Sequence, residues 1–333
     1  MFVLAILIAL ILALILTPIM RIIALKFDIV DHPDASVKTH KVAIPYLGGI
    51  SIFLSLILTM LILIAIFNLN VNKEDYGILA GSIIITILGF IDDIMRVSPF
   101  KKVFIQALVT IVIGLFGLRV NLIDSDIINS VLMFCWVVGL TNACNLIDIM
   151  DGLASGVIAI ASFFLSFMFL QKGEIFNSLL LSALAGACLG LLKYNFNPAQ
   201  IFMGDTGSLF LGFLSASMTI KFIMGEGISQ TALIPVFILG IPIFETVFVS
   251  ILRIKSGRSP LKGSKDHFAL RLVKSGFTVK QAVLITYLVG SLLGIVAVIS
   301  YNFRDIVLYI GIGLLLYAFV VYRKLSKIDM SNF

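Results

Sequence analysis

Charged residues are scarce in this chain. Asp, Glu, Lys and Arg make up only 13% of its 333 residues, whereas hydrophobic residues make up 60%. A soluble globular domain has about a quarter of its residues charged, so this composition excludes that class. Long apolar runs stand where charge is missing, and the sequence predicts an all-α protein that crosses a membrane many times.

Cysteine and histidine are also rare, with three of each. Cys135, Cys144 and Cys188 fall in or beside apolar runs without paired spacing, which indicates free thiols and argues against a disulfide framework. The histidines are too scattered along the chain for a zinc site. A bound metal would therefore be held by oxygen ligands.

About eleven apolar segments are each close to the length that a helix needs to cross a bilayer. They are residues 2–25, 45–68, 76–95, 101–119, 126–142, 153–171, 175–193, 205–224, 230–252, 281–301 and 303–322. Because the connections are short, we expect a single transmembrane catalytic domain over residues 1–333. The first segment lacks a preceding basic stretch and a small-residue cleavage site, which predicts an anchor and not a removed signal peptide.

The distribution of basic residues predicts the orientation of the chain. Most of the 24 Lys and Arg residues fall on one set of alternate connections. The positive-inside rule places that set in the cytoplasm, with the N-terminus outside and the C-terminus in the cytoplasm. We interpret the net charge of +6 as a topology signal and not as affinity for nucleic acid.

The most polar stretch within the apolar sequence runs from Asn142 to Gly152. It contains two carboxylates, Asp148 and Asp151, and a second amide, Asn145. Polar groups at the edge of a hydrocarbon layer are costly unless they are paired, hydrated or bound to a metal. Two interpretations stay open: a plain membrane–water border, or an acidic site that faces a cation and a phosphate-bearing ligand.

Two further carboxylate motifs fall on the same predicted face. Asp92 and Asp93 end the third segment, where topology does not call for Asp, and Lys102 follows at the start of the fourth. Asn195 lies just before a helix-stopping proline, and Asp205 then opens the eighth segment, where free backbone N–H groups favour anions. Asp205 is either a hard oxygen ligand or simply a helix N-cap.

Basic residues on the cytoplasmic connections offer partners for phosphate. Lys41, in the first connection, is either such a partner or an ordinary positive-inside charge. In the last connection Arg258 and Arg271 can grip phosphate, and His267 can donate a hydrogen bond or a proton. A segment that lies on anionic lipid is the alternative. Glu245, inside the ninth segment, is either functional or part of a structural ion pair.

These polar groups gather on one face of the membrane. That asymmetry argues against a path across the bilayer and for chemistry at the cytoplasmic surface. Clustered Asp residues without Cys or His partners suit Mg²⁺ or Mn²⁺, and nearby cations suit a phosphate or diphosphate. In a protein with so many spans, the expected reactant is a lipid phosphate.

Four ordered motifs carry a resemblance to a known family. They are IPYLGG at 44–49, GFIDD at 89–93, NACNLIDIMDGLA at 142–154 and NFNPAQIFMGDTGSL at 195–209. The set resembles the polyprenyl-phosphate N-acetylhexosamine-1-phosphate transferases of glycosyltransferase family 4. That family includes undecaprenyl-phosphate GlcNAc-1-phosphate transferase and phospho-MurNAc-pentapeptide translocase. The resemblance implies that a lipid phosphate attacks the β-phosphate of a UDP-sugar, releasing UMP and leaving a polyprenyl diphosphate sugar.

The resemblance also implies roles for individual residues. Asp92 would be the base toward the lipid phosphate, supported by Asp93, and direct transfer or a phospho-enzyme on Asp92 both stay open. Asp205 would be the principal Mg²⁺ ligand, with Asp93 beside it. The remaining site residues would be Asn145, Asp148, Asp151 and Asn195 around the nucleotide and metal, with Lys41 and Lys102 on phosphates.

This chain departs from the family pattern at the expected sugar site. Its last cytoplasmic connection keeps only His267 where the known branches carry several histidines, and Ile149-Met150 stands where Gly-Leu is usual. Together with Ile44-Pro-Tyr46, these departures argue against a MurNAc-pentapeptide donor, and UDP-GlcNAc is the simplest donor that remains.

Several alternatives stay open at this stage. Another UDP-amino sugar, a MurNAc-pentapeptide donor or a dolichyl phosphate acceptor would keep the same reaction. An ion-coupled transporter or a lipid-binding membrane protein would be a different class. We expect a multi-pass protein of the cytoplasmic (inner) membrane with its site facing the cytoplasm, and a homodimer is left open.

Overall fold

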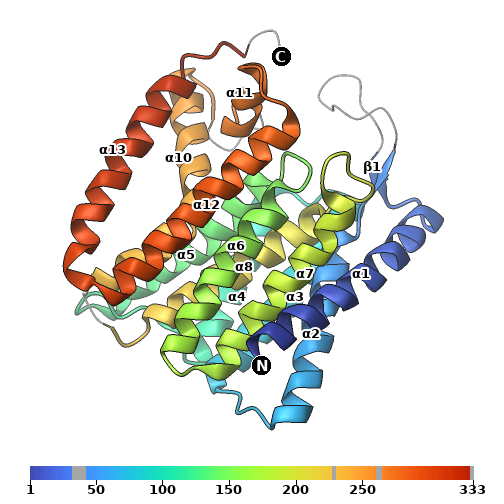
Figure 1. Ribbon diagram of the computed structural model, residues 1–333, viewed down its shortest axis with the longest axis vertical. Helices are drawn as coiled ribbons and strands as arrows, with labels where there is room; N and C mark the ends of the chain where they lie inside the picture. The colour runs from blue at the N-terminus through green and yellow to red at the C-terminus, as the bar shows by residue number, and fades with distance from the viewer. Residues whose placement is uncertain (32–42, 227–229, 260–264, 331–333) are drawn as a thin grey trace.

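The computed structural model describes residues 1–31, 43–226, 230–259 and 265–330. Within these ranges the regular secondary structure is helical except for one antiparallel pair, β1 (Val30–Asp31) and β2 (Ile44–Pro45) (Figure 1). The α-helices are α1 (Phe2–Lys26), α2 (Gly48–Phe67), α3 (Lys73–Met95), α4 (Pro99–Leu115), α5 (Asp126–Ile147), α6 (Leu153–Gln171), α7 (Ile175–Asn195), α8 (Gly204–Ile223), α9 (Ile234–Ile238), α10 (Gly240–Lys255), α11 (Phe268–Lys274), α12 (Val279–Asn302) and α13 (Val307–Leu325). Two 3₁₀ turns, η1 (Gln230–Leu233) and η2 (Arg304–Ile306), precede α9 and α13.

The protein is an all-α polytopic membrane protein, as the sequence predicted. Nine helices of the described residues are long and apolar enough to cross a membrane. The segment predicted at 230–252 is a bent pair, Thr231–Ile238 and Gly240–Lys255, which meet at 72°. Pro242 explains the break, because it has no N–H to donate to the carbonyl of Ile238. The predicted count of about eleven is reached only if the 17-residue α4 also crosses.

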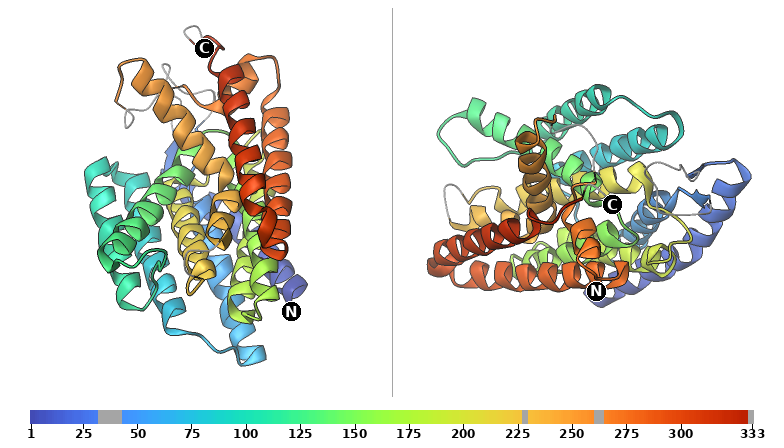
Figure 2. Two further views of the ribbon diagram at one scale, coloured as in Figure 1. Left: turned by 90° about the vertical axis from the view of Figure 1, so that its left-hand side faces the viewer. Right: turned by 90° about the horizontal axis from the view of Figure 1, so that it is seen from above.

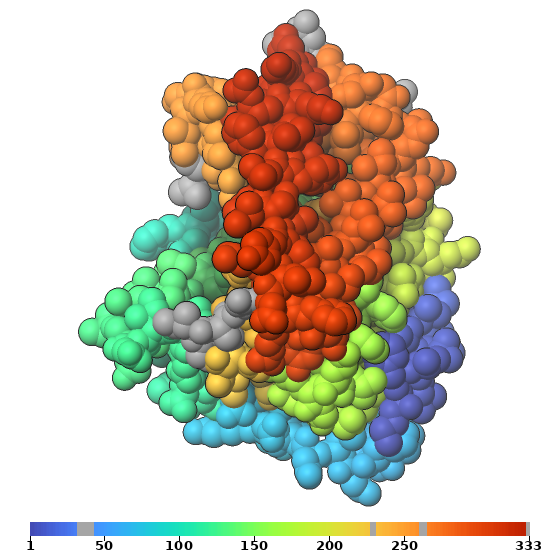
Figure 3. All heavy atoms as spheres, turned by 60° about the vertical axis from the view of Figure 1, so that its left-hand side comes forward, coloured from blue at the N-terminus to red at the C-terminus, as the bar shows by residue number. Residues whose placement is uncertain are grey.

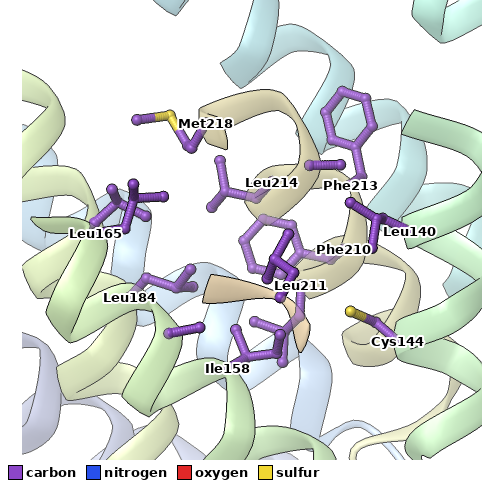
Figure 4. Packing of buried hydrophobic residues seen from close by; sticks show 14 of the residues in the cluster. Leu140, Cys144, Ile158, Leu165, Leu184, Phe210, Leu211, Phe213, Leu214 and Met218 are labelled. Atoms are coloured by element: carbon purple, nitrogen blue, oxygen red, sulfur yellow. The ribbon is translucent and has the colours of Figure 1, made fainter. Parts of the chain in front are cut away.

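Helix α8 lies at the centre of the bundle. It packs against α2, α3, α5 and α6, and nearly all of its residues are buried. In Figure 4, Phe210 and Leu214 of α8 lie among side chains of the surrounding helices, including Leu140 of α5 and Leu165 of α6. A polar site at the start of α8 is therefore carried by the most enclosed helix of the protein.

Small residues let neighbouring backbones approach α8. A Cβ atom added to Gly49 of α2 would lie 2.2 Å from the backbone nitrogen of Gly207, so only glycine fits there. Such close approach of small residues is a common means of packing helices in lipid, where apolar side chains gain little from leaving the solvent.

Helix α13 covers one flank of the molecule beside α12 (Figures 2 and 3). Only 6% of the residues in its most apolar 18-residue stretch are buried, as expected of a helix that faces lipid. The N-terminus and the C-terminal end of α13 lie toward opposite ends of the long axis in Figures 1 and 2. This separation accords with an odd number of crossings, while the direction of insertion stays a prediction.

Candidate active site

The two helices that carry the key carboxylates approach each other at a glycine. A Cβ atom added to Gly89 of α3 would lie 2.5 Å from the carbonyl oxygen of Asp205 and equally close to Cα of Thr206. The bare backbone of α3 therefore lies directly against the first turn of α8. This contact brings Asp92 and Asp93, one turn after Gly89, to the start of α8.

Asp93 caps helix α8 from the neighbouring helix. Its Oδ1 accepts a hydrogen bond from the backbone N–H of Asp205 at 2.7 Å. Its Oδ2 accepts from the backbone N–H of Thr206 at 3.1 Å and from the Thr206 hydroxyl at 2.5 Å. A carboxylate in this position satisfies donors at a helix start that have no partner within the helix. The predicted role of Asp93 as a metal ligand stays a prediction, and both of its oxygens are already engaged.

Lys102 joins two carboxylates. Its Nζ lies 2.5 Å from Oδ2 of Asp92 and 3.0 Å from Oδ2 of Asp205. The other oxygen of Asp92 accepts a hydrogen bond from the backbone N–H of Val97 at 2.6 Å, which fixes the end of α3. The structure thus brings together three of the predicted site residues: the ammonium of Lys102 on α4 lies between the carboxylates of Asp92 on α3 and Asp205 on α8.

Asp205 has a second partner on α5. Asn145 donates its side-chain N–H to Oδ1 of Asp205 at 2.8 Å, and also lies 2.9 Å from the hydroxyl of Ser208. The alternative that Asp205 is a plain N-cap does not describe this arrangement, because its carboxylate contacts the side chains of two other helices. The predicted grouping of Asn145 with Asp205 is found in the structure.

A cavity of about 620 Å³ opens beside this network. Five predicted residues line it: Asn145, Asp148, Asp151, Asn195 and Asp205. The remaining wall comes from four parts of the chain. They are Asp31 and Tyr46 at the β1–β2 pair, Ile149 and Met150 after α5, Asn197 with 202–204 leading into α8, and Lys265, Leu270, Val273 and Val279 in and around α11. The volume is in the range of small-molecule and cofactor sites.

The acidic turn between α5 and α6 is held by the connection between α7 and α8. Oδ2 of Asp151 accepts hydrogen bonds from the side chain of Asn197 at 2.9 Å and the backbone N–H of Ala199 at 3.0 Å. Oδ1 of Asn195 accepts from the backbone N–H of Gly152 at 3.1 Å. Asp151 and Asn195 therefore shape the cavity wall as well as lining it.

Asp148 faces a concentration of negative charge. Burial raises the pKa of its carboxyl to about 8, and the charges of Asp205, Asp93 and Asp151 raise this pKa as well. Within the described residues, no three acidic, His or Cys side chains are already arranged around a metal position. Asp148 and Asp205 nevertheless give the cavity two carboxylates whose mutual repulsion a divalent cation would relieve, and oxygen donors suit Mg²⁺. The residues present fit that ion.

Arg258 and Arg271 lie in a separate cluster, contrary to their predicted place beside the other site residues. Both donate to the carboxylate of Asp266, at 2.6 Å and 3.2 Å, and neither lines the cavity. Arg271 also donates to the carbonyl oxygens of Leu325 at 3.1 Å and Ile328 at 2.5 Å. The guanidinium that suits phosphate is equally suited to carbonyl groups, and here it binds the C-terminal segment to α11.

His267 does not line the cavity either. Its Nδ1 lies 2.5 Å from Oε1 of Glu245, which is fully buried, and the backbone N–H of Phe268 donates to the other oxygen of Glu245 at 3.2 Å. Of the two alternatives for Glu245, the structure favours the structural pair. This contact fastens the start of α11 to α10.

Lys41 lies outside the described residues, so its predicted contact with phosphate stays a prediction. Among the cavity residues that the sequence did not predict as site residues are Tyr46, Phe202 and Lys265. Tyr46 belongs to the IPYLGG motif, which was the available signal, and burial together with a hydrogen bond to Asp31 raises the pKa of its phenol. Lys265 brings a cation to a wall whose other side chains are acidic, neutral polar or apolar.

Comparison with known proteins places the carboxylate network in a family. The sequence pattern described as Glycosyl transferase family 4 matches residues 76–223, from α3 to α8. A protein of Bacillus subtilis described as a probable undecaprenyl-phosphate N-acetylglucosaminyl 1-phosphate transferase is 36% identical over 309 residues. The alignment covers 89% of this chain and 84% of that protein. The chain belongs to glycosyl transferase family 4.

The names of two further relatives refer to two different sugar donors. An undecaprenyl-phosphate alpha-N-acetylglucosaminyl 1-phosphate transferase of Thermotoga maritima is 29% identical over 262 residues, covering 76% of this chain and 75% of that protein. A phospho-N-acetylmuramoyl-pentapeptide-transferase of Prochlorococcus marinus is 36% identical over 211 residues, covering 56% of this chain and 57% of that protein. The family resemblance predicted from four motifs is confirmed, and the matched region of family 4 contains Asp92, Lys102, Asn145 and Asp205.

Proposed function

We propose that this enzyme transfers GlcNAc-1-phosphate from UDP-GlcNAc to a polyprenyl phosphate such as undecaprenyl phosphate, and releases UMP. The observation that carries the proposal is the position of Asp205. One carboxylate oxygen of Asp205 contacts the ammonium of Lys102, which also contacts Asp92. The other oxygen accepts a hydrogen bond from Asn145 at the cavity. Asp205 thus joins a cavity that suits a nucleotide sugar to the charged pair of Asp92 on α3 and Lys102 on α4.

The reaction exchanges one phosphorus–oxygen bond for another. An oxygen of the lipid phosphate attacks the phosphorus that carries the sugar, the bond to UMP breaks, and a diphosphate forms. A phosphate monoester has a second pKa of about 6, so the acceptor is largely ionised at neutral pH without a strong base. Asp92 would hold Lys102 in place, and the ammonium of Lys102 would neutralise charge on the reacting phosphates.

Mg²⁺ is part of this proposal, with Mn²⁺ as an alternative ion. When bound, it would supply positive charge to the donor diphosphate. Asp205 would hold it, with the carboxylate of Asp148 on the same cavity, while Asp93 would act indirectly by fixing the start of α8. Burial and the charges of Asp205, Asp93 and Asp151 raise the pKa of Asp148, and the repulsion among these carboxylates supports a cation at this place.

We further propose that the cavity faces the cytoplasm from the inner membrane. Leu270 and Val273 of α11 line the cavity, and Arg271 of the same helix binds the C-terminal segment, so both lie at one end of the molecule. The positive-inside rule assigns the C-terminus to the cytoplasm, where nucleotide sugars are found.

The test is release of UMP from UDP-GlcNAc by detergent-purified protein, with and without undecaprenyl phosphate and Mg²⁺. We expect release only when both are present. Asp205→Asn should lower it by about 100-fold or more, the usual loss when a preorganised charge is removed from a reacting centre. Asp305→Asn, which changes an exposed carboxylate on η2, should keep wild-type activity.

The other outcomes are equally informative. UMP released only from another UDP-amino sugar or from the MurNAc-pentapeptide donor would overturn the choice of GlcNAc and keep the reaction. Passage of intact UDP-GlcNAc into proteoliposomes without UMP release would overturn the transferase proposal and favour a transporter.

A further inference from the structure

Tyr287 of α12 contacts the acidic turn without reaching the cavity. Its hydroxyl donates a hydrogen bond to the carbonyl oxygen of Gly152 at 2.5 Å, and it is not among the cavity residues. The ring lies over Gly156 of α6, where an added Cβ atom would be 2.0 Å from the phenol oxygen. The absence of a side chain at Gly156 is therefore what allows Tyr287 to reach the turn.

Gly152 is the residue at which the acidic turn becomes helix α6. Its backbone is left-handed, with φ of +77°, a conformation that other residues adopt only with strain. Its N–H donates to Oδ1 of Asn195 of α7 at 3.1 Å, and its carbonyl accepts from Tyr287 of α12. The same carbonyl also accepts from the N–H of Gly156 and the hydroxyl of Ser155 within α6, so Tyr287 is its one partner from another helix among the described residues. Both polar groups of this one residue are thus fixed by side chains from other helices.

The position of the turn decides where the cavity carboxylates lie. Asp148 and Asp151 precede Gly152 directly and line the cavity, and α12 itself begins with Val279 in the cavity wall. The acceptor side of the site is built differently, from Asp92 on α3 and Lys102 on α4, whose ion pairs and hydrogen bonds involve neither Gly152 nor Tyr287.

We propose that Tyr287 is a positioning residue for the donor side of the reaction: its hydroxyl holds the Gly152 carbonyl and so sets Asp148 and Asp151 against the bound nucleotide sugar. This inference rests on the proposed function. It predicts a selective effect, in which binding of the nucleotide weakens and use of the lipid phosphate is unchanged.

Tyr287→Phe removes the hydroxyl and leaves the ring over Gly156. We expect the KM for UDP-GlcNAc to rise about three- to tenfold, the effect of one lost neutral hydrogen bond. The KM for undecaprenyl phosphate should match the wild type, and the melting temperature without ligand should fall by no more than a few degrees. Tyr301→Phe is the matched control, because Tyr301 lies on the same helix and packs on Phe222, with ring centroids 5.4 Å apart.

Gly156→Ala attacks the same contact from α6, because the added methyl group occupies the place of the phenol oxygen. It should raise the KM for UDP-GlcNAc at least as much as Tyr287→Phe does. Titration calorimetry with UMP and MgCl₂ gives a second measurement that needs no turnover, and Tyr287→Phe should weaken UMP binding by a similar factor.

Two results would overturn the inference. One is unchanged UMP affinity and unchanged donor KM in Tyr287→Phe. The other is a parallel loss toward both substrates together with a lower melting temperature, which would make the contact purely structural. A wild-type protein that releases no UMP from UDP-GlcNAc would overturn the proposed function. Weaker UMP binding by Tyr287→Phe would still support the positioning role in that case.

Discussion

Among single residues, Asp148 carries the clearest pH signature. Burial, with the nearby charges of Asp205, Asp93 and Asp151, raises its pKa to about 8, whereas an Asp side chain in an unfolded chain titrates near pH 4. Between these two values the folded protein holds a proton that the unfolded chain releases. Stability therefore falls as pH rises through that window, and the contribution of Asp148 levels off above it.

We predict that the melting temperature of the protein in chelator falls between about pH 6 and pH 8. Asp148→Asn should flatten this fall, because an amide does not titrate. Differential scanning fluorimetry of both proteins in one detergent measures the two slopes, with Asp305→Asn as the control that keeps the wild-type slope. Parallel curves for wild type and Asp148→Asn would contradict the raised pKa.

The sequence predicted the grouping of Asp92, Lys102, Asn145 and Asp205, because polar and charged groups at the edge of the membrane are costly unless they pair with one another. It did not predict the direction of Arg271, since a guanidinium binds carbonyl oxygens as readily as phosphate and only the folded chain decides between them. The contact of Tyr287 was also missed. Its one sequence signal was the spacing of Gly152 and Gly156, which is typical of close helix approach.

At the scale of secondary-structure elements, the contact between α3 and α8 depends on a missing side chain. Gly89→Ala would place a methyl group 2.5 Å from the backbone of Asp205 and Thr206. Overpacking of this kind costs about 1–3 kcal/mol, and here it also separates the carboxylates of the two helices. We predict a lower melting temperature and a lower rate of UMP release.

Gly139→Ala is the matched control, because Gly139 lies inside α5 with open space where a Cβ atom would be added. Alanine favours a helix over glycine by about 1 kcal/mol, so this variant should be at least as stable as the wild type. Melting curves and UMP assays of the two variants settle the point. Equal behaviour of the two would show that the α3–α8 approach does not matter.

The presence of the helices followed from the apolar runs, but their breaks did not. Pro242 lies within the run predicted as one segment at 230–252, and the signal for a break was therefore in the sequence. Hydropathy alone averages over such a residue, while the backbone has to leave the Ile238 carbonyl without its helical partner. The shorter α4 begins at Pro99 and is followed by Gly117 with φ of +101°, two local signals that apolar content also hides.

For the whole molecule, the direction of insertion is the prediction that most needs a test. The N-terminus and the end of α13 lie toward opposite ends of the long axis, and basic residues favour a cytoplasmic C-terminus (Figure 1). A green fluorescent protein fused by a linker after residue 333 should therefore fluoresce, and alkaline phosphatase fused there should be inactive. The reverse pattern would place the cavity on the outer face and contradict the proposed access to cytoplasmic UDP-GlcNAc.

The binding of the C-terminal segment by Arg271 also orders events during synthesis. Ile328, one of the carbonyl partners of Arg271, follows it by 57 positions in the chain. When α11 leaves the ribosome, this anchor has not yet been made, and α12 and α13 must enter the membrane before it arrives. A nascent chain stalled before α13 would already hold every carboxylate of the site, yet the wall formed by Leu270 and Val273 would lack its final support. Only a chain that has completed α13 can therefore make the contact that ties α11 to the C-terminal segment.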